Sequence, residues 1–230
     1  MPGEKFQAAG RLTAKAAKLW GTGTRCASED RVGRLRSVRA NRLEHARVLP
    51  GDELICDAIA SLTHAVTIRR PRKDVWPWLV QMGAGSRGGW YSYDFIDNGR
   101  RPSADAVEPG LQAVTVGTLF PAMPGATDGF HVLQLQRDRY LVLGWRPAAG
   151  APPIMTWAFV LEDWPNFSTR LLVRARGASA YPFYGLPRWI GEPVIRLGHF
   201  VMERQQLLTI ASRVESQPRD ANRLVRRPAA

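Results

Sequence analysis

The stretch GHFVMERQQLLTIASRVE, residues 198–215, decides the fold, because apolar side chains recur in it at intervals of three, four and seven. The same period reaches back to Trp189 and predicts a long amphipathic helix with a broad apolar face. Pro193 and Gly198 weaken its first turns, so we expect the regular helix to begin only near Gly198. A helix of this kind needs an apolar surface to cover.

Sequences typical of β-strands upstream supply that surface. In residues 168–177, STRLLVRARG, the side chains of Leu171 and Val173 share one face, and arginines occupy the other. This alternation predicts a sheet with one buried face and one wet face. Further strands are predicted over residues 62–70, 114–120, 130–138, 139–145 and 154–164.

The order of elements indicates the architecture. A strand is followed by a short helix over residues 71–83, in which Pro77 is tolerable only in the first turn. Several antiparallel strands and the long C-terminal helix come next. We therefore predict an α+β fold in which a curved antiparallel sheet wraps around the helix, with a cavity between them.

Charge divides the chain into three parts. The net charge is +12, yet residues 1–47 hold 11 lysines and arginines against 4 acids, and residues 216–230 hold 4 against 1. We predict a basic N-terminal extension at 1–47, partly helical or disordered, a folded domain at 48–215, and a disordered basic tail at 216–230. The extension could touch nucleic acid or an anionic membrane.

The sequence lacks the signatures of several kinds of site and segment. No run of 18 apolar residues predicts a transmembrane helix, and the first 20 residues do not form a signal peptide. Cys26 and Cys56 make neither a disulfide framework nor a metal site, and the four histidines lack metal-binding spacing. We expect a cytoplasmic protein with no metal and no cofactor.

Taken together, seven segments resemble the START-like superfamily, also called SRPBCC, which includes plant pollen allergens, lipid-transfer domains and polyketide cyclases. The chain is most similar to bacterial members without an assigned function, over about residues 48–215. The matching segments are LPGDEL (49–54), AVTIRRPRKDVWPWLVQMG (65–83), RGGWYSYDFIDN (87–98), VGTLF (116–120), WAFVLE (157–162), TRLLVRAR (169–176) and GHFVMERQQLLTI (198–210). The resemblance implies a helix-grip fold with a cavity for a hydrophobic ligand, and it implies no particular reaction.

The loop QMGAGSRGGWYSYDFIDNG, residues 81–99, leaves three interpretations open. It carries Arg87, Trp90, Tyr91, Tyr93, Asp94 and Asp97. The loop could simply pack over one end of the sheet, with Arg87 paired to one of the two aspartates. It could instead be a gate whose rings line the mouth of the cavity. In the third interpretation, Asp94 performs acid–base chemistry with Tyr91 or Arg87.

These observations predict a protein that binds a hydrophobic or aromatic small molecule, such as a lipid or a polyketide-like compound, without catalysis. The predicted ligand-binding residues are Arg87, Trp90, Tyr91, Tyr93, Trp145, Trp157, Phe159 and Phe200. One alternative is a cyclase- or hydratase-like enzyme that uses Asp94, and another is a nucleic-acid or membrane-surface adaptor that works through residues 1–47. His199 and Glu203, four apart, favour a surface pair on the last helix over a polar pair inside the cavity.

Overall fold

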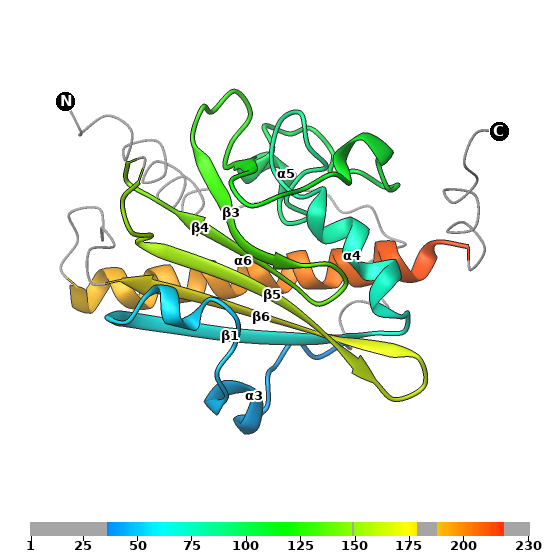
Figure 1. Cartoon of the computed structure of the whole chain (residues 1–230), viewed down its shortest axis with the longest axis horizontal. Coiled ribbons are helices and arrows are strands. Elements are labelled where there is room, and N and C mark those ends of the chain that lie inside the picture. Colours follow the sequence, from blue (N-terminus) through cyan, green and yellow to red (C-terminus); the bar gives the residue numbers. More distant parts are fainter. Residues whose placement is uncertain (1–35, 149, 179–187, 219–230) are drawn as a thin grey trace, which may run out of the picture.

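The protein is an α+β structure in which a six-stranded antiparallel sheet packs against a long C-terminal helix, which confirms the predicted fold class (Figure 1). The computed structural model describes residues 36–148, 150–178 and 188–218. The strand order is β1-β6-β5-β4-β3-β2. The strands are β1 (Ala58–Ile68), β2 (Leu119–Pro121), β3 (Gly129–Gln136), β4 (Tyr140–Trp145), β5 (Met155–Trp164) and β6 (Ser168–Ala178). The helices are α3 (Arg42–Ala46), η1 (Asp52–Leu54), α4 (Arg72–Val80), α5 (Asp94–Asp97), η2 (Pro109–Leu111) and α6 (Arg188–Ser216).

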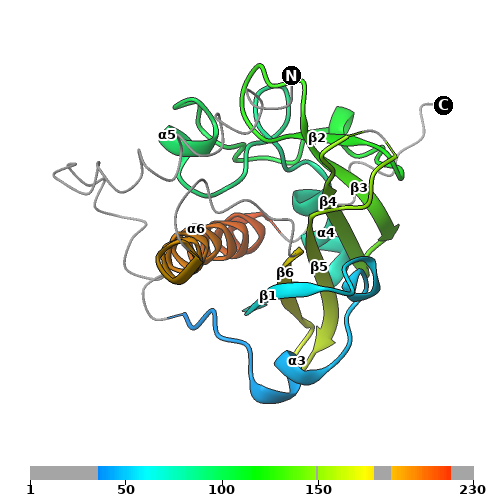
Figure 2. The same cartoon turned by 90° about the vertical axis from the view of Figure 1, so that its left-hand side faces the viewer.

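Helix α6 covers the inner face of the sheet and also contacts α4. Figure 2 looks nearly along α6 and shows it on one side of the strands, in a helix-grip-like arrangement. The apolar contact lies in the C-terminal half of α6, where Leu207, Ile210, Ala211 and Val214 are fully buried against the strands and α4. This half of the helix therefore anchors it to the sheet.

Two prolines lie inside helices, contrary to the sequence-based expectations. Helix α6 begins at Arg188 and continues through Pro193 and Gly198, so the predicted start near Gly198 is wrong. Pro77 is the sixth residue of α4 and lies beyond the first turn. Each proline removes one helical hydrogen bond, while the remaining bonds and the packing of the buried side chains hold the helix on both sides.

The outer face of β6 is covered, so the prediction that its arginines form a wet face is also wrong. Arg174 is only 4% exposed, and its guanidinium donates to Asp52 Oδ2 at 2.6 Å, to Thr63 Oγ1 at 2.9 Å and to the carbonyl oxygen of Glu44 at 2.8 Å. Arg170 Nε donates to Glu44 Oε1 at 2.8 Å. The covering carboxylates and carbonyls come from the segment before β1, which alternation within β6 alone could not reveal.

Residues 36–47, at the end of the predicted basic extension, pack against the sheet. The carbonyl of Val38 accepts the backbone N–H of Ala65 at 3.1 Å, and Arg39 forms an antiparallel bridge with His64. Arg36 donates to both oxygens of Glu215 at 2.8 Å, which fastens the segment to the end of α6. Residues 1–35 and 219–230 lie outside the described residues, and the predictions for them stay predictions.

Removing the Arg174 side chain tests how much the outer network contributes. We expect Arg174→Ala to lower the free energy of unfolding by about 3–5 kcal/mol, because the mostly covered carboxylate of Asp52 loses its closest cation and the carbonyls of Glu44, His45 and Arg47 lose a donor. Urea denaturation followed by circular dichroism measures the change. The control is Arg137→Ala, since the Arg137 side chain is 84% exposed, and it should cost less than about 0.5 kcal/mol. Equal stability of the two variants would contradict a structural role for Arg174.

Candidate ligand-binding site

Five aromatic side chains form a continuous ring cluster on the inner face of the sheet. The ring of Trp157 lies 5.0 Å from Phe159, 5.5 Å from Trp90 and 5.6 Å from Phe130, and Phe130 lies 5.4 Å from Trp145. These rings come from β3, β4, β5 and the loop after α4. Phe159 and Trp90 are buried, whereas Phe130, Trp145 and Trp157 keep part of their surface exposed. The cluster thus offers aromatic surface that the protein has not fully covered.

Tight backbone geometry in the aromatic loop places Trp90 in this cluster. Gly83 and Gly89 form an antiparallel bridge, with N–H to carbonyl distances of 3.1 and 2.8 Å. Gly89 has φ +82°, and a Cβ there would come within 2.2 Å of Ser103 Oγ. Only glycine fits this position, so the loop closes directly before the tryptophan.

Opposite the ring cluster, the stripe of α6 that faces the sheet changes from apolar to polar. His199, Glu203 and Gln206 follow one another at intervals of four and three, and we call these three residues the polar stripe. Trp157 Nε1 donates to Glu203 Oε2 at 3.1 Å, and Gln206 Nε2 donates to the carbonyl oxygen of Trp90 at 2.8 Å. The polar stripe therefore contacts the ring cluster directly.

The surface pair favoured for His199 and Glu203 is not formed, because Glu203 is 2% exposed and points inward. Its Oε2 lies 3.8 Å from His199 Nε2. The His199 ring stacks on His64 of β1 at 5.8 Å, and His64 also meets the ring of Phe200 at 5.7 Å. The two histidines thus connect the polar stripe to the edge of the sheet.

Four buried polar atoms of this group have no hydrogen-bond partner among the described residues. They are His64 Nε2, His199 Nδ1, Glu203 Oε1 and Gln206 Oε1. Buried polar atoms are almost always paired in folded proteins, because an unpaired one forfeits the hydrogen bonds that it makes in water. Polar atoms of this kind beside partly exposed aromatic rings are typical of ligand-binding sites.

Burial keeps this group uncharged near neutral pH. It raises the pKa of Glu203 to about 8, although the hydrogen bond from Trp157 lowers it. Burial, and to a smaller extent the neighbouring His64, lowers the pKa of His199 to about 4. Burial also lowers the pKa of His64. At pH 7, His199 and Glu203 therefore face each other as neutral groups and do not form an ion pair.

Arg87 and Tyr91 lie apart from the polar stripe and are engaged with the protein itself. Arg87 Nε donates to the carbonyl oxygen of Met82 at 2.6 Å, another of its N–H groups donates to that of Val80, and the guanidinium lies 4.1 Å from the ring centre of Phe120. Tyr91 is 1% exposed, and its hydroxyl accepts from Gln81 Nε2 at 2.6 Å. Burial raises the pKa of the Tyr91 hydroxyl to about 12.

Tyr93 is the residue directly before the short helix α5, and Asp94 is the first residue of that helix. The ring of Tyr93 lies 5.9 Å from that of Phe95. Asp94 Oδ1 accepts from Ser103 Oγ at 2.6 Å, and its Oδ2 accepts from the backbone N–H of Ser103 at 3.0 Å. The carboxylate thus fastens α5 to the following segment.

Trp90, Trp145, Trp157, Phe159 and Phe200 are the predicted ligand residues that the structure connects through ring contacts, with Phe200 joined through His64 and His199. Arg87, Tyr91 and Tyr93 lie elsewhere. Sequence reasoning missed His64, Phe130 and Gln206. For His64 the available signal was the alternation of β1, and for Gln206 it was the spacing of three from Glu203.

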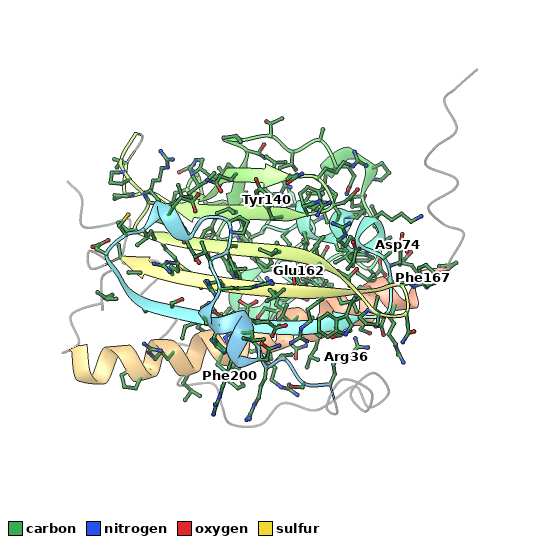
Figure 3. All side chains as sticks on the ribbon, turned by 60° about the horizontal axis from the view of Figure 1, so that its bottom comes forward. Arg36, Asp74, Tyr140, Glu162, Phe167 and Phe200 are labelled. Carbon is green, nitrogen blue, oxygen red and sulfur yellow. The ribbon has the colours of Figure 1, made fainter. Side chains whose placement is uncertain are left out.

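A surface pocket on the outer face is less suited to a ligand. Its volume is about 330 Å³, and it is lined by Arg72, Arg139, Tyr140, Val160, Leu161, Glu162 and Asp163. Figure 3 shows Tyr140 and Glu162 on this side of the sheet. Both carboxylates of the pocket are already paired, since Arg72 pairs with Asp163 at 2.8 Å and Arg47 pairs with Glu162 at 2.5 Å.

Two kinds of feature are absent from residues 36–148, 150–178 and 188–218. None of the helices in these ranges combines the length and the hydropathy that a membrane crossing requires. The same ranges contain no group of three or more His, Cys, Asp or Glu side chains arranged to hold a metal ion.

Comparison with known proteins gives matches among solved structures. No family model matches the chain, and no curated protein matches it. Protein MLL2253 from Mesorhizobium loti is 13% identical over 69% of this chain and 99% of its own, with a TM-score of 0.43. CalU16 from Micromonospora echinospora is 17% identical over 68% of this chain and 88% of its own, with a TM-score of 0.33. These likenesses concern the fold and assign no ligand or reaction.

The raised pKa of Glu203 predicts how stability depends on pH. The folded protein keeps this proton to about pH 8, whereas the unfolded chain loses it near the ordinary value of 4.5. The folded state binds more protons in between, so this group destabilises the fold as pH rises, by up to about 1.4 kcal/mol per pH unit. Glu203→Gln removes the titration, and we expect its stability relative to wild type to increase between pH 5 and 8.

Urea denaturation at several pH values measures this difference. The lowered pKa values of the two histidines destabilise both proteins equally at acid pH, so the difference between the proteins isolates Glu203. Glu108→Gln, which alters an exposed carboxyl, controls for the loss of a surface charge. Parallel pH profiles for wild type and Glu203→Gln would rule out a protonated Glu203.

Proposed function

We propose that this protein binds a planar, largely apolar small molecule between the ring cluster and the part of α6 that precedes Leu207. The observation that carries the proposal is the junction of partly exposed rings with the polar stripe, three of whose buried atoms lack partners among the described residues. A ligand placed there would cover the aromatic surface and meet the polar atoms at the same time.

The packing of α6 supports this location. Its C-terminal half is filled by Leu207, Ile210, Ala211 and Val214, each at most 1% exposed. Further toward the N-terminus, Val194, Leu197 and Phe200 are 46%, 57% and 39% exposed. Apolar surface thus remains open on the part of the helix that precedes Leu207 and carries the polar stripe.

Burial alone would give useful affinity. A two-ring aromatic molecule that buries roughly 250 Å² of apolar area gains about 6–7.5 kcal/mol at 25–30 cal/mol per Å². This gain alone corresponds to a dissociation constant of roughly 3–30 μM, and the loss of rotational and translational freedom weakens binding, so we expect dissociation constants of about 0.1–1 mM from burial alone. No chemical step is needed for such a function.

The two alternative functions have less support. The Asp94 carboxylate accepts from Ser103, and the Tyr91 hydroxyl accepts from Gln81, so both groups that an acid–base role would use are engaged within the protein. An adaptor role for residues 1–47 falls mainly on residues 1–35, which lie outside the described residues. The basic side chains of Arg36 and Arg47 in the described part are paired with Glu215 and Glu162.

Binding of the neutral fluorophore N-phenyl-1-naphthylamine tests the proposed function. We expect saturable fluorescence enhancement with wild type and at least about tenfold weaker binding with Phe200→Asp, because a carboxylate at the rim disfavours an apolar ligand. The change is mild for the fold, since Phe200 is 39% exposed.

Phe167→Asp is the matched control, because Phe167 is 90% exposed in the turn between β5 and β6, well apart from Phe200 (Figure 3). It should bind the fluorophore as wild type does. Equal binding by both variants, with native circular dichroism, would refute a site at the ring cluster.

A further inference from the structure

We propose that the polar stripe, together with His64, recognises an uncharged carbonyl or hydroxyl group on the ligand. The site would then select neutral polar aromatic molecules over hydrocarbons and over anions. This inference rests on the proposed function and adds the chemical class of the ligand.

The orientation of Glu203 and Gln206 is the first argument. Each side chain binds the ring cluster through one of its polar atoms. Glu203 Oε2 accepts from Trp157, and Gln206 Nε2 donates to the carbonyl oxygen of Trp90. Each therefore holds its second polar atom, Oε1, in a fixed direction, and that atom has no partner among the described residues. Both side chains are more than nine-tenths buried, so the two atoms face the interior and not bulk water.

The spacing of the group is the second argument. Residues 199, 203 and 206 lie along one face of α6 over about 10 Å, at 1.5 Å per residue. His64 extends the row through its ring stack with His199. A row of this length matches one edge of a two-ring molecule whose flat face rests on Trp157 and its neighbours.

A hydrocarbon would leave all four atoms unpaired. Sites that hydrogen-bond a ligand bind an analogue without the polar group much more weakly, because the buried polar atoms of the protein then have no hydrogen-bond partner. A ligand with a carbonyl or hydroxyl group supplies the missing partner and binds more tightly.

The neutrality of the site disfavours an anion. Glu203, kept protonated by burial, can donate a hydrogen bond, and each neutral imidazole has one donor and one acceptor. The titratable groups around Glu203 on the described elements are His199 on α6 and His64 on β1, with His45 on α3 acting on His64. The other contacts come from Trp157 on β5 and the Trp90 backbone, which carry no charge. A carboxylate ligand would be buried without a counter-ion.

Three naphthalenes of similar shape test this selectivity by displacing N-phenyl-1-naphthylamine from the full-length protein at pH 6.5. They are 2-ethylnaphthalene, which is apolar, 2-acetylnaphthalene, which carries a neutral carbonyl, and 2-naphthoate, which is an anion. We expect the acetyl compound to displace the probe at about tenfold lower concentration than either of the others, as one additional buried hydrogen bond predicts.

Variants of Glu203, together with measurements at a second pH, test whether Glu203 donates the hydrogen bond to the ligand carbonyl. At pH 9.5 wild-type Glu203 is ionised, and we expect the advantage of the acetyl compound to fall to about threefold or less. Glu203→Gln can accept from Trp157 through its amide oxygen and donate through its amide nitrogen at any pH, so it should keep the advantage at both pH values. Glu203→Leu should lose the advantage at both pH values and still bind the ethyl compound.

Each outcome bears on one proposal. If neither the probe nor any naphthalene binds, the proposed function fails. If all three naphthalenes bind wild type equally, the proposed function is supported and the proposed selectivity for a neutral polar group is refuted. If the wild-type advantage does not change with pH, Glu203 is not the donor. If Glu203→Leu does not fold, the comparison of wild type with Glu203→Gln at the two pH values still decides this point.

Discussion

A helix can bury one apolar stripe against a sheet, and the fold depends on how far that stripe extends along α6. From Leu207 onward the stripe is continuous, and Leu207, Ile210 and Val214 close the interior. Beyond Gln206 toward the N-terminus the same face becomes polar, and close apolar packing can no longer continue. The site proposed here lies at this change, so the element that stabilises the fold also sets the limit of the ligand region.

The fold was predictable where local periodicity decides structure. Alternation placed five of the six strands, but most of the strand predicted over residues 114–120 is not formed and β2 covers only Leu119–Pro121. The recurrence of apolar residues placed α6, although its first turns were missed. The covering of the outer face was not predictable, because the arginines of β6 alternate as they would on a wet surface. Their partners, Glu44 and Asp52, lie more than a hundred residues away in the chain, and no local pattern connects them.

The candidate site was predictable only in part, and for a related reason. Aromatic residues on strands share a face by alternation, so Trp157 and Phe159 could be grouped from sequence. Glu203 could not be placed inside, because a spacing of four from His199 fits the exposed face of a helix as well as the buried one. Arg87 and Tyr91 adopt positions fixed by long-range contacts and by the positive φ of Tyr91, 59°, which local sequence does not specify.

The pairing of Arg39 with His64 has a further consequence. β1 ends one side of the sheet, and such a strand normally displays free N–H and carbonyl groups that invite another chain to add a strand. Here the backbone of residues 38 and 39 occupies part of this ladder. The segment before β1, which also pairs with the arginines of β6, thus covers part of the edge at which another chain could add a strand.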